Sequence, residues 1–145
     1  MSLQIQAMKS FIRHIPKRIY EETNPEITKE VEQEEIQTSI WSLQPDKAAG
    51  PDGFSIAFYR SLWLLIKRDL LKIIRCVFRK NKIGGFNNST YLALIPKELT
   101  HSSFNHFRPI SLCKSSYKIT SKVLANRVKP LLPNLISENQ GGFVP

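Results

Sequence analysis

Two basic residues, Lys97 and Arg108, have side chains that could bind phosphate together. Lys97 follows a short apolar run that ends in Pro96, and Arg108 stands next to Pro109. A lysine supplies a compact, mobile charge, and an arginine supplies a planar fork that binds two phosphate oxygens at once. Phosphoryl transfer is catalysed mainly by positioning and by neutralising charge, so such a pair suits a nucleoside triphosphate. Without further context, two solvated surface bases remain the commoner explanation.

A second set of basic side chains could follow the backbone of a nucleic acid. Lysine and arginine residues fill the positions between apolar residues in segments 55–79 and 115–130, which gives each segment a basic outer side. An ordinary solvated face explains these charges equally well. Aromatic residues lie among the bases, but Trp41, Phe58 and Trp63 border apolar helix faces, which favours core packing. The expected backbone contacts are Lys72, Arg75, Arg79, Lys118 and Lys122.

The sequence offers no catalytic site. A templated polymerase holds two metal ions with paired carboxylates, usually on adjacent strand and turn positions. The aspartates are Asp46, Asp52 and Asp69; none lies in an apolar strand, and no two are adjacent. The histidines do not group with acids or cysteines at ligand spacing. We therefore expect no metal site and no cofactor bound by this chain alone.

The charge is distributed unevenly along the 145 residues, whose formal net charge is +9. Residues 1–20 form a basic arm without acids, residues 21–52 carry a net charge of −7, and residues 53–145 carry +12. A segment of this charge repels itself unless an anion is near, which favours nucleic acid as a partner over a merely soluble basic surface.

The sequence also bears on where the protein is located and on the state of its two cysteines. Neither a secretory signal nor a long apolar run is present, so we expect no membrane segment and an intracellular protein, nuclear or cytoplasmic, that is not secreted. Cys76 and Cys113 lack zinc-ligand spacing. Cys76 lies in an apolar helical stretch and is expected to be a buried thiol. No pattern in the sequence indicates the oligomeric state.

The elements that must position these residues are mostly helical. Residues 29–43 predict a helix with Thr28 as N-cap, and the Gly50–Gly53 turn then breaks the periodicity. Residues 55–79 predict a long helix, broken at most once. Short strands are expected at 90–95 and 108–112, followed by a helix that starts at Ser115 or Ser116. The predicted class is α+β, mostly helical with a short β-element.

Several phrases of the chain, in order, resemble the reverse transcriptase of plant-type non-LTR (LINE-type) retrotransposons. Their collinearity at familiar separations makes the resemblance specific, and it runs from about Ile15 to the last residue. The phrases are DKAAGPDGF (46–54), FY (58–59) with Trp63, LIPK (94–97), RPISLC (108–113), YKI (117–119), KVLANR (122–127) and ISENQGGFVP (136–145).

The resemblance implies an RNA-directed DNA polymerase of right-hand shape that uses magnesium, an RNA template, a DNA primer and deoxynucleoside triphosphates. By motif position, Lys97 and Arg108 resemble the residues that hold the triphosphate of the incoming nucleotide. The loop with Gly50, Asp52 and Gly53 resembles the family's loop near the template strand. The stretch with Gln140, Gly141 and Phe143 resembles the family's support for the template and nucleotide pocket.

The chain departs from the family where it ends. The family continues past Val144-Pro145 with Gly-Arg and then with the palm and its aspartates, so this chain is expected to be a fingers fragment that is inactive alone. We expect a basic arm at 1–20, an acidic lead-in helix and turn loop at 21–53, and a partial reverse transcriptase domain at 54–145. The alternatives are a stand-alone nucleic-acid-binding module and a non-functional retroelement remnant.

Overall fold

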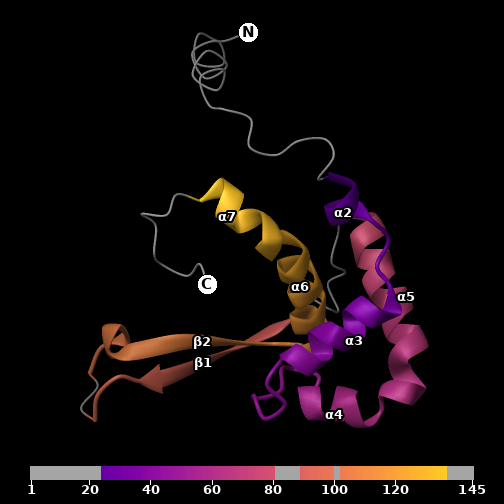
Figure 1. Ribbon diagram of the computed structural model, residues 1–145. Helices are drawn as coiled ribbons and strands as arrows, with labels where there is room; N and C mark the ends of the chain where they lie inside the picture. The colour runs from indigo at the N-terminus through magenta and orange to yellow at the C-terminus, as the bar shows by residue number, and fades with distance from the viewer. Residues whose placement is uncertain (1–23, 81–88, 100–101, 137–145) are drawn as a thin grey trace, which may run out of the picture. The chain divides into compact units, whose positions relative to one another are not determined.

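The computed structural model describes residues 24–80, 89–99 and 102–136. Within these ranges helices dominate, and a two-stranded sheet accompanies them (Figure 1), which confirms the predicted α+β class. Residues 30–126 form one compact unit. A second unit contains α2 (Asn24–Thr28), η3 (Lys129–Leu131) and α7 (Leu132–Leu135). The predicted boundaries at 20 and 53 stay predictions, although the compact unit 30–126 continues across position 53.

The first predicted helix starts later than expected. Helix α3 (Gln33–Ser42) has Glu32 as its N-cap, and the Glu32 N–H donates to the Glu35 carboxylate at 3.2 Å, as in a capping box. Thr28 belongs instead to α2, where its hydroxyl donates to the Asn24 carbonyl oxygen. The prediction of Thr28 as N-cap was therefore wrong. The helix is capped instead by Glu32 and Glu35, which form a capping box at its first turn.

The second helical segment is broken once, within the limit of at most one break that the sequence predicted. Helix α4 (Ile56–Ser61) begins at its N-cap Ser55, whose hydroxyl accepts a hydrogen bond from the Phe58 N–H. Helix α5 (Trp63–Lys80) follows after a single residue, Leu62. The break shifts the helical phase, so Trp63 is buried while Leu65, two residues later, is 76% exposed. Cys76 is exposed, so its predicted burial was wrong.

The strands confirm the prediction closely. Strands β1 (Thr90–Pro96) and β2 (Phe107–Cys113) pair antiparallel, with the short helix η2 (Phe104–His106) before β2. Helix α6 (Ser115–Val128) begins two residues after the sheet ends. Its buried side is formed by Ser116, Ile119, Thr120 and Val123. Leu124, the next residue after Val123, is 47% exposed and lies outside this buried side.

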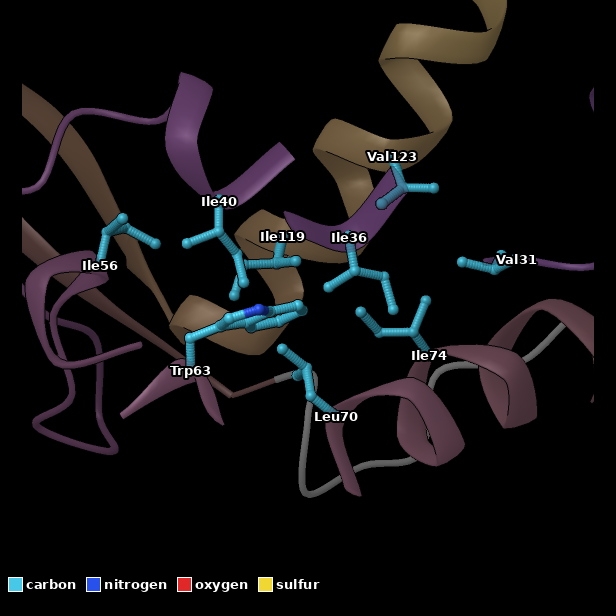
Figure 2. Packing of buried hydrophobic residues seen from close by; sticks show 9 residues of the cluster. All are labelled: Val31, Ile36, Ile40, Ile56, Trp63, Leu70, Ile74, Ile119 and Val123. Atoms are coloured by element: carbon cyan, nitrogen blue, oxygen red, sulfur yellow. The ribbon is translucent and has the colours of Figure 1, made fainter. Parts of the chain in front are cut away.

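The core belongs to the helices of unit 30–126. Figure 2 shows its nine buried apolar side chains, which come from α3, α4, α5 and α6 and from Val31 before α3. Neither strand has a fully buried residue. The hairpin is thus held by the hydrogen bonds between its two strands and by contacts at its base, the end where Thr90 lies opposite Cys113. The core members are Val31, Ile36, Ile40, Ile56, Trp63, Leu70, Ile74, Ile119 and Val123.

Candidate phosphate-binding hairpin

The β1–β2 ladder sets which side chains of the hairpin share a face. Ile95 lies opposite Arg108, and Pro96 lies opposite Phe107. The Lys97 N–H donates to the His106 carbonyl oxygen at 2.7 Å, so the ladder continues one pair beyond β1 with Lys97 opposite His106. Lys97 and Arg108 are therefore diagonal neighbours on one face, a relation that separates Cα atoms by roughly 7–8 Å.

Both basic side chains of this diagonal pair are exposed. The Lys97 Nζ donates to the carbonyl oxygen of Asn105 at 2.8 Å, which holds the ammonium against the turn. The Arg108 guanidinium makes no hydrogen bond or ion pair with any residue that the structure describes. Next to them, the His106 Nδ1 is buried without a partner among the described residues. The pair can thus present one restrained cation and one open guanidinium fork to an anion.

The two prolines of the hairpin lie where the ladder needs no donor. Because the Lys97 N–H points across the hairpin to the His106 carbonyl oxygen directly opposite, the neighbouring pair 96/107, and with it 94/109, is of the non-hydrogen-bonded kind. The nitrogens of Pro96 and Pro109 therefore point away from the partner strand. This explains how two prolines fit into a regular two-stranded sheet.

The basic residues expected along α5 have acidic neighbours. Lys72 pairs with Asp69 at 3.2 Å on the exposed surface. Arg75 donates to the Val31 carbonyl oxygen at 2.7 Å, and Glu30 bridges Arg75 and Arg79. The hydrogen bond from Arg79, helped by the charges of both arginines, lowers the pKa of the Glu30 carboxyl below its ordinary value.

The two basic residues expected along α6 differ in their surroundings. The Lys118 Nζ donates to the Ala48 carbonyl oxygen at 2.9 Å and so holds the loop between α3 and α4. Lys122, one turn further along, makes no such contact within the described residues. Of the five expected backbone contacts, Lys122 alone has no bond or ion pair to another described residue, and the role of all five stays a prediction.

The Gly50–Gly53 loop is a well-defined turn. The Gly53 N–H donates to the Gly50 carbonyl oxygen at 3.0 Å, and Gly53 has a φ of 73°, which favours glycine. The Asp52 carboxylate accepts from the Phe54 N–H at 3.4 Å. Burial, together with the charge of Asp52, raises the pKa of the Tyr59 hydroxyl. The loop's predicted place near a template strand remains a prediction.

Three further residues expected at the site, Gln140, Gly141 and Phe143, lie outside the described residues. Among the residues described, no three His, Cys, Asp or Glu side chains group in a way that could hold a metal ion. No helix of the described part is long and apolar enough to cross a bilayer.

Sequence reasoning missed the arginines that bind backbone carbonyls. The Arg60 guanidinium donates to the carbonyl oxygens of Ile40, Trp41 and Leu43 at 3.4, 2.8 and 2.7 Å, and thereby caps the C-terminus of α3. In the other unit, Arg127 donates to the carbonyl oxygens of Ile27 and Lys29. These partners are far apart in sequence, so no local pattern could have revealed them.

Comparison with known proteins gives one informative similarity. The chain is similar to the transposon TX1 uncharacterized 149 kDa protein of Xenopus laevis, with 27% identity over 112 residues. The match covers 77% of this chain but 9% of that protein, so the chain corresponds to a small part of its relative. No model of a known protein family matches the sequence. The sequence is thus related to that of a transposon-encoded protein.

Proposed function

We propose that this chain is part of the fingers region of a non-LTR retrotransposon reverse transcriptase, and that its hairpin binds the triphosphate of an incoming deoxynucleotide. The observation that carries the proposal is the diagonal placement of Lys97 and Arg108 on one exposed face, where the Arg108 guanidinium has no hydrogen-bond or ion-pair partner among the described residues. The similarity to a transposon-encoded protein and the collinear phrases support it.

The chemistry of the pair fits an anion with several oxygens. Arg108 would bind two oxygens of one phosphate through its fork, and Lys97 would exchange the Asn105 carbonyl for a charged oxygen of the next phosphate. That exchange replaces a neutral acceptor with an anionic one, which strengthens the hydrogen bond. The hairpin would therefore hold and neutralise the triphosphate without itself performing the transfer.

Polymerase activity, with an RNA template and a DNA primer, belongs to the proposal for a longer protein. Magnesium would accompany the nucleotide in such an enzyme, but the described aspartates do not fit its coordination. Asp52 accepts from its own turn and Asp69 pairs with Lys72, on separate elements.

The test is nucleotide binding by the full chain, measured by isothermal titration calorimetry with dTTP and with inorganic tripolyphosphate. Arg108→Met should lower the affinity for both ligands about tenfold or more, because a charge-assisted hydrogen bond contributes about 1.5–3 kcal/mol. Arg108→Lys keeps the charge and loses the planar fork, so its affinity for both ligands should lie between that of the unmodified chain and that of Arg108→Met.

Arg68→Met is the matched control for this experiment. Arg68 is exposed on α5 and makes no hydrogen bond or ion pair with the described residues, so its replacement removes the same charge elsewhere. We expect it to leave dTTP affinity within about twofold, since exposed charges at a distance are screened. Equal losses for Arg68→Met and Arg108→Met would mean that net charge alone drives binding, and the site would be refuted.

The alternative of a stand-alone nucleic-acid binder depends on the basic side chains of α5. Arg75 and Arg79 share Glu30, and Lys72 faces Asp69, so this surface is partly neutralised. No observation favours it over the hairpin. The alternative of a non-functional remnant requires a chain that does not fold, and cooperative thermal unfolding of the purified chain would exclude it.

A further inference from the structure

The loop before α4 contacts the junction between β2 and α6 at backbone level. At Gly50, an added Cβ would lie 2.3 Å from the Cys113 carbonyl oxygen and 2.6 Å from the Lys114 nitrogen. Side chains can move away from such an approach, but main-chain atoms cannot without moving the strand or the helix. The absence of a side chain at Gly50 is therefore a condition of this contact.

Two hydrogen bonds from α6 fix the same loop. The Lys118 Nζ donates to the Ala48 carbonyl oxygen at 2.9 Å, before Gly50 in sequence. The Ser115 hydroxyl donates to the Phe54 carbonyl oxygen at 2.6 Å, after it. The helix was expected to start at Ser115 or Ser116; Ser115 is its first residue, and the Ser115 hydroxyl makes this contact. The loop is thus bound on both sides of the close approach.

These contacts lie where they can orient the hairpin. Cys113 is the last residue of β2, pairs with Thr90 at the start of β1, and is followed by Lys114, which is 5% exposed. Because neither strand has a fully buried residue, the base is the part of the hairpin that is fixed by other elements. The direction of both strands then depends on what holds this base.

We propose that residues 46–54 form a clamp that fixes the direction of the hairpin relative to the helical core, with Gly50, Ser115 and Lys118 as its positioning residues. The clamp is inferred from the contacts above. Its role in positioning the phosphate-binding face of Lys97 and Arg108 rests on the proposed function. A triphosphate needs this face alone. A nucleic-acid strand that contacts hairpin and core together needs the clamp.

A distance measurement tests the clamp without any ligand. Cys76 on α5 is exposed and can carry one spin label, and Leu99, which is 99% exposed near the tip of the hairpin, can be replaced for the second as Leu99→Cys. Cys113→Ser prevents labelling at the base, and its hydroxyl can still accept the Thr90 hydrogen bond. Double electron–electron resonance spectroscopy then measures the distribution of distances between the two spin labels, one on the core and one on the hairpin, in the full chain.

The double variant Ser115→Ala/Lys118→Met should broaden this distribution, and Gly50→Ala should shift or broaden it further. Lys122→Met, one turn along α6, is the control and should leave it unchanged, since Lys122 makes no hydrogen bond or ion pair with the described residues. If both clamp variants keep the narrow distribution of the control while they remain folded by circular dichroism, the clamp is refuted.

A second readout separates positioning from general loss of structure. Ser115→Ala alone, which loosens the clamp but keeps the expected backbone contact Lys118, should bind a single-stranded oligonucleotide about fivefold more weakly, the factor of one ordinary hydrogen bond, while its dTTP affinity stays within about twofold. Equal loss of both affinities would indicate unfolding of the hairpin and contradict a positioning role. If the unmodified chain binds neither ligand, the proposed function fails, and the distance measurement alone decides about the clamp.

Discussion

Replacing Gly50 with alanine would place a methyl group against the main chain at the junction of β2 and α6. Its Cβ would stand 2.3 Å from the Cys113 carbonyl oxygen, 2.4 Å from the Cys113 carbonyl carbon and 2.6 Å from the Lys114 nitrogen. All three are main-chain atoms, so relief requires the loop to separate from the junction. Such a separation also stretches the bonds that Ser115 and Lys118 make to the loop.

The expected loss follows from these parts. Overpacking against a rigid neighbour costs about 1–3 kcal/mol, and each lost hydrogen bond adds about 0.5–1.5 kcal/mol. With one overpacking cost and two lost hydrogen bonds, we therefore expect the free energy of unfolding to fall by about 2–6 kcal/mol. For a unit of this size the melting temperature should fall by about 10 °C or more, since each kcal/mol shifts it by about 4–8 °C.

Gly53→Ala is the matched control, because it adds the same methyl group three residues away. Nothing lies within 4 Å of its Cβ, so the change costs only the strain of a φ of +73°, about 1–2 kcal/mol. Urea and thermal unfolding followed by circular dichroism give both values. If Gly53→Ala destabilises the chain as much as Gly50→Ala does, the close approach of Gly50 is not what holds the loop, and the reasoning fails.

Two further changes test other parts of the unit. Arg60→Met removes the donors to three carbonyl oxygens at the end of α3 and should lower the free energy of unfolding by about 1–3 kcal/mol, whereas Arg68→Met should leave the urea midpoint nearly unchanged. The pKa of Glu30 is depressed in the folded chain below its ordinary value of 4.5, so its ion pairs stabilise above pH 4.5 and are lost as the pH falls through the folded pKa. Carbon-13 NMR titration of the Glu30 carboxyl checks this; Arg79→Gln should return the pKa toward 4.5, and no movement would contradict the pairing.

The hairpin was predictable because its signals are local. Residues 90–95 combine β-branched and aromatic types and end at a proline, and the strand observed at Thr90–Pro96 agrees almost to the residue. The shared face of Lys97 and Arg108 was not predictable, since it depends on the register of pairing. That register appears only once Ile95 is known to lie opposite Arg108.

The helix faces were harder to predict because a single break changes the phase. The one-residue interruption at Leu62 turns α5 relative to the uninterrupted pattern, so Trp63 packs in the core while Leu64 and Leu65 are 81% and 76% exposed. The role of Arg60 was hidden for a different reason. Its acceptors lie 17 to 20 positions earlier in the chain, and no short-range pattern encodes such a contact.

The outward-facing nitrogens of Pro96 and Pro109 bear on self-association. A hairpin with apolar side chains open on both faces, such as Leu92 at 64% and Ile95 at 46% exposure, is the kind of element on which intermolecular sheets grow. Such growth needs a row of free N–H groups along the outer edge, and each strand lacks one donor in that row. A further strand could therefore not add to either edge in unbroken register, and replacing both prolines would turn this hairpin into a template for aggregation.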